Sequence, residues 1–140
     1  MSALAAPDEV LPHRPPFLFL DEVVRLEIGA SAEGRWHLTG DEAFFGGHFP
    51  GRPTLPGVLM LEAIAQLGAY AVLCDESYAD KLPLFGGVDK ARFRRQVVPG
   101  DTLTLEIELG RMSARAGKGH GRAHVAGETA CEADLLFVFA

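Results

Sequence analysis

Several features that define large classes of proteins are scarce in this sequence. No apolar run in its 140 residues approaches the roughly 18 that a membrane-spanning helix needs, and the first ten residues lack the basic and apolar segments of a secretion signal. The two cysteines, Cys74 and Cys131, lie among apolar neighbours, which favours buried reduced thiols over a disulfide. We therefore expect a cytoplasmic protein with no membrane insertion.

An excess of basic residues is also missing. Thirteen Lys and Arg against 19 Asp and Glu give a net charge of -6, which argues against nucleic acid as a main partner, because phosphate binding depends on basic side chains. His120 and His124 have no evident third ligand, so no metal site is expected. With 48% apolar residues, positions 1–140 are predicted to form a single domain.

Alternating apolar and polar residues predict strands on both sides of a central segment. The expected strands cover residues 17–28, 35–38, 102–109 and 131–139, with one more inside 113–125. In the first of them, Val24, Leu26 and Ile28 are expected to share a half-buried face. These strands are predicted to form one antiparallel sheet.

The central segment, Gly57 to about Leu73, is rich in helix formers, and Pro56 suits the first helical position. Its apolar residues cover the whole circumference, so other elements must enclose the helix. The sequence therefore predicts an α+β protein with the hot-dog fold, in which a curved antiparallel sheet wraps one long central helix. An exposed sheet edge would invite pairing with a second copy.

A single histidine, His48, lies in a loop that runs from Phe44 to Gly57. Four glycines and three prolines give this loop a specified path rather than a flexible one. Both a catalytic base and a structural histidine held by hydrogen bonds fit this position.

Glu62 is the only charged residue of the predicted helix. Burying an unpaired carboxylate there would cost several kcal/mol on order-of-magnitude grounds, and Gln66 lies one turn further on the same side. A structural hydrogen bond at a subunit interface is one explanation, and an acid in an active site is the other. Apolar surroundings favour a protonated carboxyl, so we expect Glu62 to donate a proton and a neutral His48 to accept one.

The start of the helix supplies a third component. The amides of Gly57, Val58 and Leu59 are predicted to lack intrahelical acceptors and to lie at the positive end of the helix dipole. Glycine at position 57 also lets a carbonyl approach the backbone closely. A base, an acid and oxyanion donors together suit proton removal next to a carbonyl.

Residues 47–66, GHFPGRPTLPGVLMLEAIAQ, resemble the signature HFPGxPxxPGVLxxEAxAQ of the FabZ-type 3-hydroxyacyl-acyl-carrier-protein dehydratases. Blocks at 11–21 (LPHRPPFLFLD) and 86–101 (GGVDKARFRRQVVPGD) extend the resemblance over nearly the whole chain. The chain departs from the family pattern at Gln96, where proline is usual, at Pro16, where an aromatic is common, and over residues 114–124.

The resemblance implies a dimer, and commonly a trimer of dimers, in which His48 of one subunit and Glu62 of its partner form each site. It implies that His48 takes the C2 proton, that Gly57 N–H, with Val58 beside it, holds the thioester oxygen, and that Glu62 with Gln66 protonates the departing 3-hydroxyl. The product would be a trans-2-enoyl thioester. No cofactor is implied beyond the phosphopantetheine arm that carries the substrate.

A cluster of basic residues lies in the third block. Lys90, Arg92 and Arg94 are predicted on one side of an extended strand, and Arg95 adds to their charge. A solvated edge strand protected by charge would look the same. The resemblance favours contact with an acidic acyl carrier protein.

Three rival functions share the predicted fold. A hot-dog thioesterase would use a carboxylate to activate water, but would leave His48 without a task. A non-catalytic acyl-thioester sensor would keep the pocket and lose the acid or the base, yet both are present. The related dehydratase that also isomerises the double bond carries aspartate where this chain has Glu62, so glutamate favours simple dehydration.

Overall fold

Six strands and one long helix make up most of the computed structural model, which describes residues 4–140. The helices are α1 (Pro7–Val10) and α2 (Gly57–Leu73), with short 3-10 turns η1 (Ala43–Gly46) and η2 (Glu76–Tyr78). The strands are β1 (Glu22–Glu27), β2 (Ser31–His37), β3 (Pro83–Phe93), β4 (Thr102–Met112), β5 (Ala116–Val125) and β6 (Glu128–Phe139). Within this part of the chain, no helix is long and apolar enough to cross a membrane.

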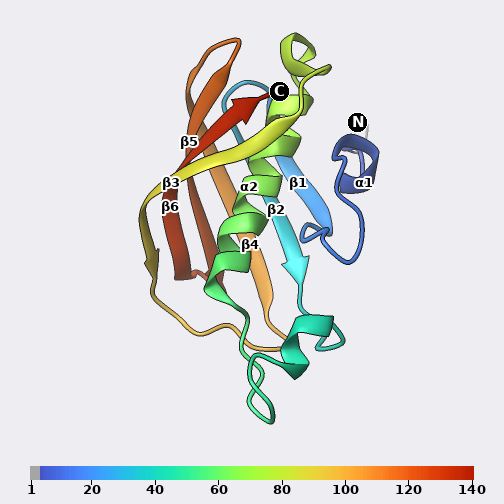
Figure 1. Cartoon of the computed structure of the whole chain (residues 1–140), viewed down its shortest axis with the longest axis vertical. Coiled ribbons are helices and arrows are strands. Elements are labelled where there is room, and N and C mark those ends of the chain that lie inside the picture. The colour runs from blue at the N-terminus through green and yellow to red at the C-terminus, as the bar shows by residue number, and fades with distance from the viewer. Residues whose placement is uncertain (1–3) are drawn as a thin grey trace.

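The strands form one antiparallel sheet in the order β1-β2-β4-β5-β6-β3. Figure 1 shows the sheet curving around α2, with β3 passing over the C-terminal half of the helix. The N-terminal arm with α1 lies on the other side of α2, and the loop before α2 extends beyond the helix start. The predicted hot-dog fold is confirmed.

The predicted limits of α2 are confirmed at both ends, with Pro56 as the N-cap rather than the first helical residue. From Met60 to Val72 its side chains are buried, except for the half-buried Glu62. The helix approaches the sheet so closely that the ring of Phe137 occupies the space where a side chain at Gly68 would lie. Close packing on all sides explains why its apolar residues form no single stripe.

The alternating stripes also predicted β4 and β6 correctly. Leu103, Leu105 and Ile107 of β4 are buried, and so are the inward residues of β6 (Cys131, Ala133, Leu135 and Phe137). The further strand expected inside 113–125 is β5. Cys131 and Cys74 are free thiols as expected, but only Cys131 is fully buried, whereas Cys74 is half-buried. Burial raises the pKa of Cys131 to about 12.

The prediction of a first strand over residues 17–28 was wrong in its length and in which side chains it buries. β1 begins only at Glu22, and a register shift between Val23 and Arg25 breaks the alternation. Val23 is therefore the buried residue, while Val24 and Ile28 are exposed. A β-bulge of this kind turns the following side chains to the other face of the sheet.

Candidate active site

His48 lies in the loop between η1 and α2. Its Nδ1 is 2.7 Å from the carbonyl oxygen of Thr54, and the N–H of Thr54 donates to the carbonyl oxygen of His48 at 2.8 Å. Because a carbonyl oxygen can only accept, Nδ1 carries the hydrogen, and the lone pair of the neutral ring is on Nε2. This is the tautomer that a base acting through Nε2 requires.

Main-chain hydrogen bonds hold the loop in shape. Phe49 and Arg52 exchange two of them, at 3.1 and 2.9 Å, which closes a tight turn directly after His48. The ring of Phe49 stacks on the imidazole with 4.1 Å between centroids. The predicted rigid path therefore has a physical basis in short-range backbone contacts.

The base of the loop is attached to the segment after β3. Leu55 N–H donates to the carbonyl oxygen of Val97 at 2.8 Å, and Gln96 Nε2 donates to the hydroxyl oxygen of Thr54 at 2.6 Å. Gln96, at one of the positions that depart from the family pattern, thus touches the residue that orients His48. Nothing in the sequence pattern pointed to Thr54.

Glu62 and Gln66 lie side by side on α2, as their spacing predicted. Gln66 is 1% exposed, and its amide donates to Glu62 Oε2 at 2.9 Å and to the carbonyl oxygen of Phe17 at 3.0 Å. Its own oxygen accepts from Phe19 N–H at 2.8 Å. Both amide hydrogens are therefore used within the chain, and Gln66 ties the N-terminal arm to the helix beside the acid.

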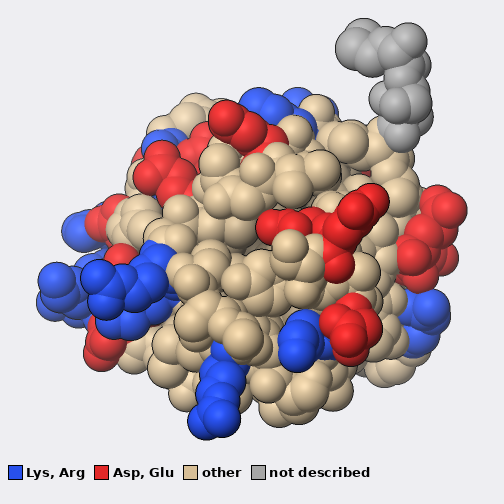
Figure 2. All heavy atoms as spheres, turned by 90° about the horizontal axis from the view of Figure 1, so that it is seen from above, with Lys and Arg blue, Asp and Glu red and all other residues tan. Residues whose placement is uncertain are grey.

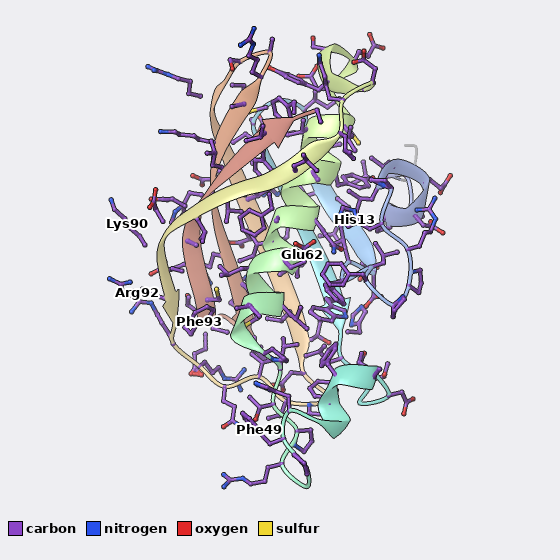
Figure 3. The ribbon with its side chains drawn as sticks, in the orientation of Figure 1. His13, Phe49, Glu62, Lys90, Arg92 and Phe93 are labelled. Carbon is purple, nitrogen blue, oxygen red and sulfur yellow. The ribbon has the colours of Figure 1, made fainter. Side chains whose placement is uncertain are left out.

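Glu62 faces a cavity of about 120 Å³ between α2, the arm and the sheet. Its walls are His13, Glu62, Ala65, Gln66, Ala69, Pro83, Leu84, Phe85 and Phe137. His48 is not among them. Figure 3 shows Glu62 midway along the helix, whereas Phe49, the neighbour of His48, lies on the loop beyond the helix start. A single chain thus does not bring the predicted base and acid together.

His13 is a polar neighbour of Glu62 that sequence reasoning missed. Its Nε2 lies 3.7 Å from Glu62 Oε2. The only sequence signal for this residue is its place in the block LPHRPPFLFLD, which contributed to the resemblance without a role of its own.

The start of α2 differs in one detail from the prediction. Leu59 N–H donates to the carbonyl oxygen of Pro56 at 3.0 Å, so only Gly57 and Val58 precede the first hydrogen bond of the helix. A Cβ atom on Gly57 would lie 2.7 Å from the ring of Phe93, so this close contact also requires glycine. Phe93 was not singled out from the sequence, although its ring lies directly against Gly57.

A groove of about 520 Å³ runs past this helix start. It is lined by Thr54, Leu55, Gly57, Val58, Met60, Phe93, Arg94, Arg95 and Gln96. Residues predicted for the oxyanion site thus share one groove with two of the residues predicted to contact a carrier protein.

The four predicted basic residues fall into two pairs. Arg94 bonds Glu132 at 2.6 Å, and Arg95 bonds Glu128 at 3.0 Å. Lys90 and Arg92 are exposed, have no carboxylate within ion-pair distance among residues 4–140, and point away from the helix in Figure 3. The strand is not regular there, because its pairing shifts between Asp89 and Arg92.

On the face shown in Figure 2, several basic groups gather at the left edge, while acidic groups lie near the centre and along the margins of an otherwise uncharged surface. Among residues 4–140, no group of three or more His, Cys, Asp or Glu side chains could hold a metal ion.

A further cavity of about 890 Å³ lies on the arm side of α2. Four aromatic residues, Phe17, Phe19, Trp36 and Phe44, contribute to its walls together with Leu59. Leu59 is three residues before Glu62 and so lies on the same face of the helix. No sequence pattern pointed to this cavity, since its walls come from separate segments of the chain.

Solved structures share this architecture at low sequence identity. The dehydratase heterocomplex ApeI:P from Xenorhabdus doucetiae matches with a TM-score of 0.82 and 19% identity over 98% of this chain and 92% of that chain. A mutant thioesterase, PA1618 from Pseudomonas aeruginosa, matches with a TM-score of 0.66 and 14% identity over 85% and 80%. The fold therefore defines the class of hot-dog proteins, in which both activities occur.

Sequence comparison defines the family. A family described as the FabA-like domain matches residues 11–134. The 3-hydroxyacyl-[acyl-carrier-protein] dehydratase FabZ of Moorella thermoacetica is 53% identical over 91% of this chain and 90% of its own length. The corresponding protein of Chloroflexus aggregans is 55% identical over 91% and 89%. The chain belongs to the FabZ family of 3-hydroxyacyl-[acyl-carrier-protein] dehydratases.

Proposed function

We propose that this chain removes water from a 3-hydroxyacyl thioester carried on acyl carrier protein, giving the trans-2-enoyl thioester of fatty acid synthesis. His48 of one subunit takes the C2 proton through Nε2, and Glu62 of the partner protonates the departing 3-hydroxyl. The observation that carries the proposal is the hydrogen bond from His48 Nδ1 to Thr54, because it leaves Nε2 free to accept a proton.

The surroundings of the two residues suit their different roles. Glu62 faces a cavity whose walls include apolar groups such as Ala65 and Phe85, and its Oε1 has no hydrogen-bond partner among the described residues, so that oxygen can reach a bound substrate. Gly57 N–H precedes the first hydrogen bond of α2, at the positive end of the helix dipole, and this supports a role in stabilising the negative charge that develops on the thioester oxygen. Little reorganisation is needed when this charge develops, because the helix already holds the N–H group in position.

A second copy of the chain is needed to complete the site. β3 is an edge of the sheet, and it exposes Leu84, Phe85, Val88 and Phe93, while Val58 is exposed on α2. Exposed apolar side chains on an unpaired strand edge favour association with another chain. We propose a dimer formed along β3, with further assembly into a trimer of dimers.

The substrate needs both a charged docking surface and an apolar compartment. Lys90 and Arg92 are available to an acidic carrier protein, since neither has a carboxylate partner among the described residues. The groove past Gly57 suits the phosphopantetheine arm. The aromatic cavity beside Leu59 offers an apolar wall near the acid, which suits an acyl chain.

The test is an assay of the purified protein on a 3-hydroxyacyl thioester, with enoyl absorbance and free-thiol release recorded together. Enoyl formation without thiol is expected, and thiol without enoyl would instead indicate a thioesterase. Binding without either product would indicate a sensor. His48→Ala and Glu62→Gln should each lower kcat by roughly 10²- to 10⁴-fold while gel filtration still shows the dimer. Near-normal turnover in either variant would overturn the assignment.

A further inference from the structure

The arm that carries His13 is fixed on both sides of this residue. Tyr70 of α2 donates its hydroxyl hydrogen to the carbonyl oxygen of Ala5 at 2.6 Å, and Gln66 holds Phe17 and Phe19. His13 is therefore held beside Glu62 by contacts with the same buried helix.

The surroundings of His13 indicate which of its two ring nitrogens carries a hydrogen. Nδ1 is buried and has no hydrogen-bond partner among residues 4–140, and Nε2 is 3.7 Å from Glu62 Oε2. The guanidinium of Arg14 donates to the carbonyl oxygens of Leu11 and His13 and forms no ion pair with Glu62. An N–H group at the buried Nδ1 would have no acceptor, which is costly. A hydrogen on Nε2, which faces Glu62, avoids that cost.

The N–H groups of Gln66 and His13 face the same oxygen of the Glu62 carboxyl. Gln66 already donates to Oε2 at 2.9 Å, and the Nε2–H group of His13 faces that oxygen as well. Oε1 has no hydrogen-bond partner in the described part of the chain and is the free oxygen of the carboxyl group. The carboxyl hydrogen is therefore best placed on Oε1.

We propose that His13 is a positioning residue that assigns the acid proton to Oε1 of Glu62 and stabilises the carboxylate formed when that proton leaves. The inference rests on the proposed role of Glu62 as the acid. The Oε1–H bond breaks as a new O–H bond forms on the 3-hydroxyl, which departs as water with the electrons of the C3–O bond. The electrons of the C2–H bond form the double bond, and the C2 proton goes to His48.

The distance between His13 Nε2 and Glu62 Oε2 explains why His13 stabilises the transition state rather than the ground state. At 3.7 Å, Nε2 is too far to hydrogen-bond the neutral acid, but it is near enough to close on the developing carboxylate. An interaction that strengthens as charge develops raises kcat rather than substrate affinity. Loss of the N–H group should therefore lower kcat and leave KM nearly unchanged.

Three variants of one residue provide the test. His13→Phe keeps a ring and removes the N–H group, His13→Gln places an amide at the position of Nε2, and His13→Asn places it at the position of Nδ1. We expect His13→Phe and His13→Asn to lower kcat by roughly 10- to 100-fold with KM changed less than about twofold, and His13→Gln to recover to within about fivefold of wild type. In His13→Phe the basic limb of the kcat profile should move to higher pH, because the carboxylate has lost a donor.

The outcomes separate a positioning role from simple packing. Equal losses in all three variants, an unmoved pH limb, or wild-type kcat in His13→Phe would overturn the proposal. If His13→Phe fails to fold, the difference in kcat between His13→Gln and His13→Asn tests the proposal by itself. Glu62→Gln is measured alongside: near-normal turnover in it would remove the acid assignment itself, whereas an inactive Glu62→Gln with a wild-type-like His13→Phe would remove only the role of His13.

Discussion

His48 and Glu62 are fixed by contacts of different range. The imidazole is oriented by Thr54, six residues away, through a carbonyl oxygen of the same short loop. The carboxyl is oriented by Gln66, which in turn depends on Phe17, 49 residues away, in the N-terminal arm. The base is therefore held by local backbone structure, and the acid is held by the packed fold.

This difference has a consequence for how each half-site responds to change. Backbone hydrogen bonds persist when a side chain is replaced, so the loop should tolerate substitutions around His48. The Glu62 side uses buried side-chain groups, which leave unsatisfied partners when they are removed. Substitutions near the acid should therefore cost more stability and more activity than equivalent ones near the base.

The division of each site between two subunits is tested by placing the intact base and the intact acid in different chains. His48→Ala and Glu62→Gln chains, unfolded and refolded together, should form mixed dimers in about half of the cases, each with one intact site. Activity should rise from near zero to about a quarter of wild type. Enoyl formation in the mixture, compared with each variant refolded alone, checks this. A mixture no more active than its components would mean that one chain supplies both residues.

Replacement of Gln66 tests the acid side. Gln66→Leu leaves the buried N–H of Phe19 without an acceptor and frees Glu62 from its donor, so we expect about 2 to 4 kcal/mol less unfolding free energy and a lower kcat. Denaturant unfolding and the enoyl assay measure the two effects.

The only other glutamine of the chain is the matched control for this variant. Gln96 is exposed, so Gln96→Leu should cost less than about 0.5 kcal/mol. Equal destabilisation by the two leucine variants would contradict the idea that the acid side depends on buried contacts.

The same distinction between local and distant contacts explains what the sequence could predict. The limits of α2 and the facing of β4 and β6 follow from uninterrupted local patterns. The loop of His48 was predictable as rigid because its glycines and prolines act locally. β1 was misjudged because a bulge after Val23 and the attachment of Phe17 and Phe19 to Gln66 replace the regular strand. No local pattern encodes either feature.

The site was predictable in its residue types and less so in its neighbours. Glu62 and Gln66 share a helix, so their proximity follows from spacing alone. His13 reaches Glu62 only after the arm folds back along α2, and the ring of Phe93 reaches Gly57 only after β3 crosses the helix. Contacts between segments so far apart in the chain depend on the topology of the fold. Local patterns in a single sequence do not predict them.

A charge reversal outside both half-sites tests the proposed docking surface. Lys90→Glu/Arg92→Glu should raise KM for carrier-bound substrate by roughly 5- to 30-fold with kcat nearly unchanged, because it reverses charge on the proposed docking surface. KM for the coenzyme A analogue should change less than about twofold.

The control for charge reversal is Arg25→Glu/Arg111→Glu, which makes the same change in net charge with two exposed arginines on β1 and β4. β1 is the edge of the sheet opposite β3. This variant should leave both KM values close to wild type. If the two double variants behave alike, net charge rather than a docking surface explains the effect.

The smallest effect is expected at the base side. Gln96→Pro, which introduces the residue usual in the family, removes the hydrogen bond to the Thr54 hydroxyl. The backbone bonds from Thr54 to His48 and from Leu55 to Val97 remain, and they determine where the carbonyl oxygen of Thr54 points. We expect kcat within about threefold of wild type and an unchanged acid limb of its pH profile, because an exposed side-chain hydrogen bond contributes little. A loss of more than about tenfold would show that a side chain supports the base as well, and the contrast between the two half-sites would then fail.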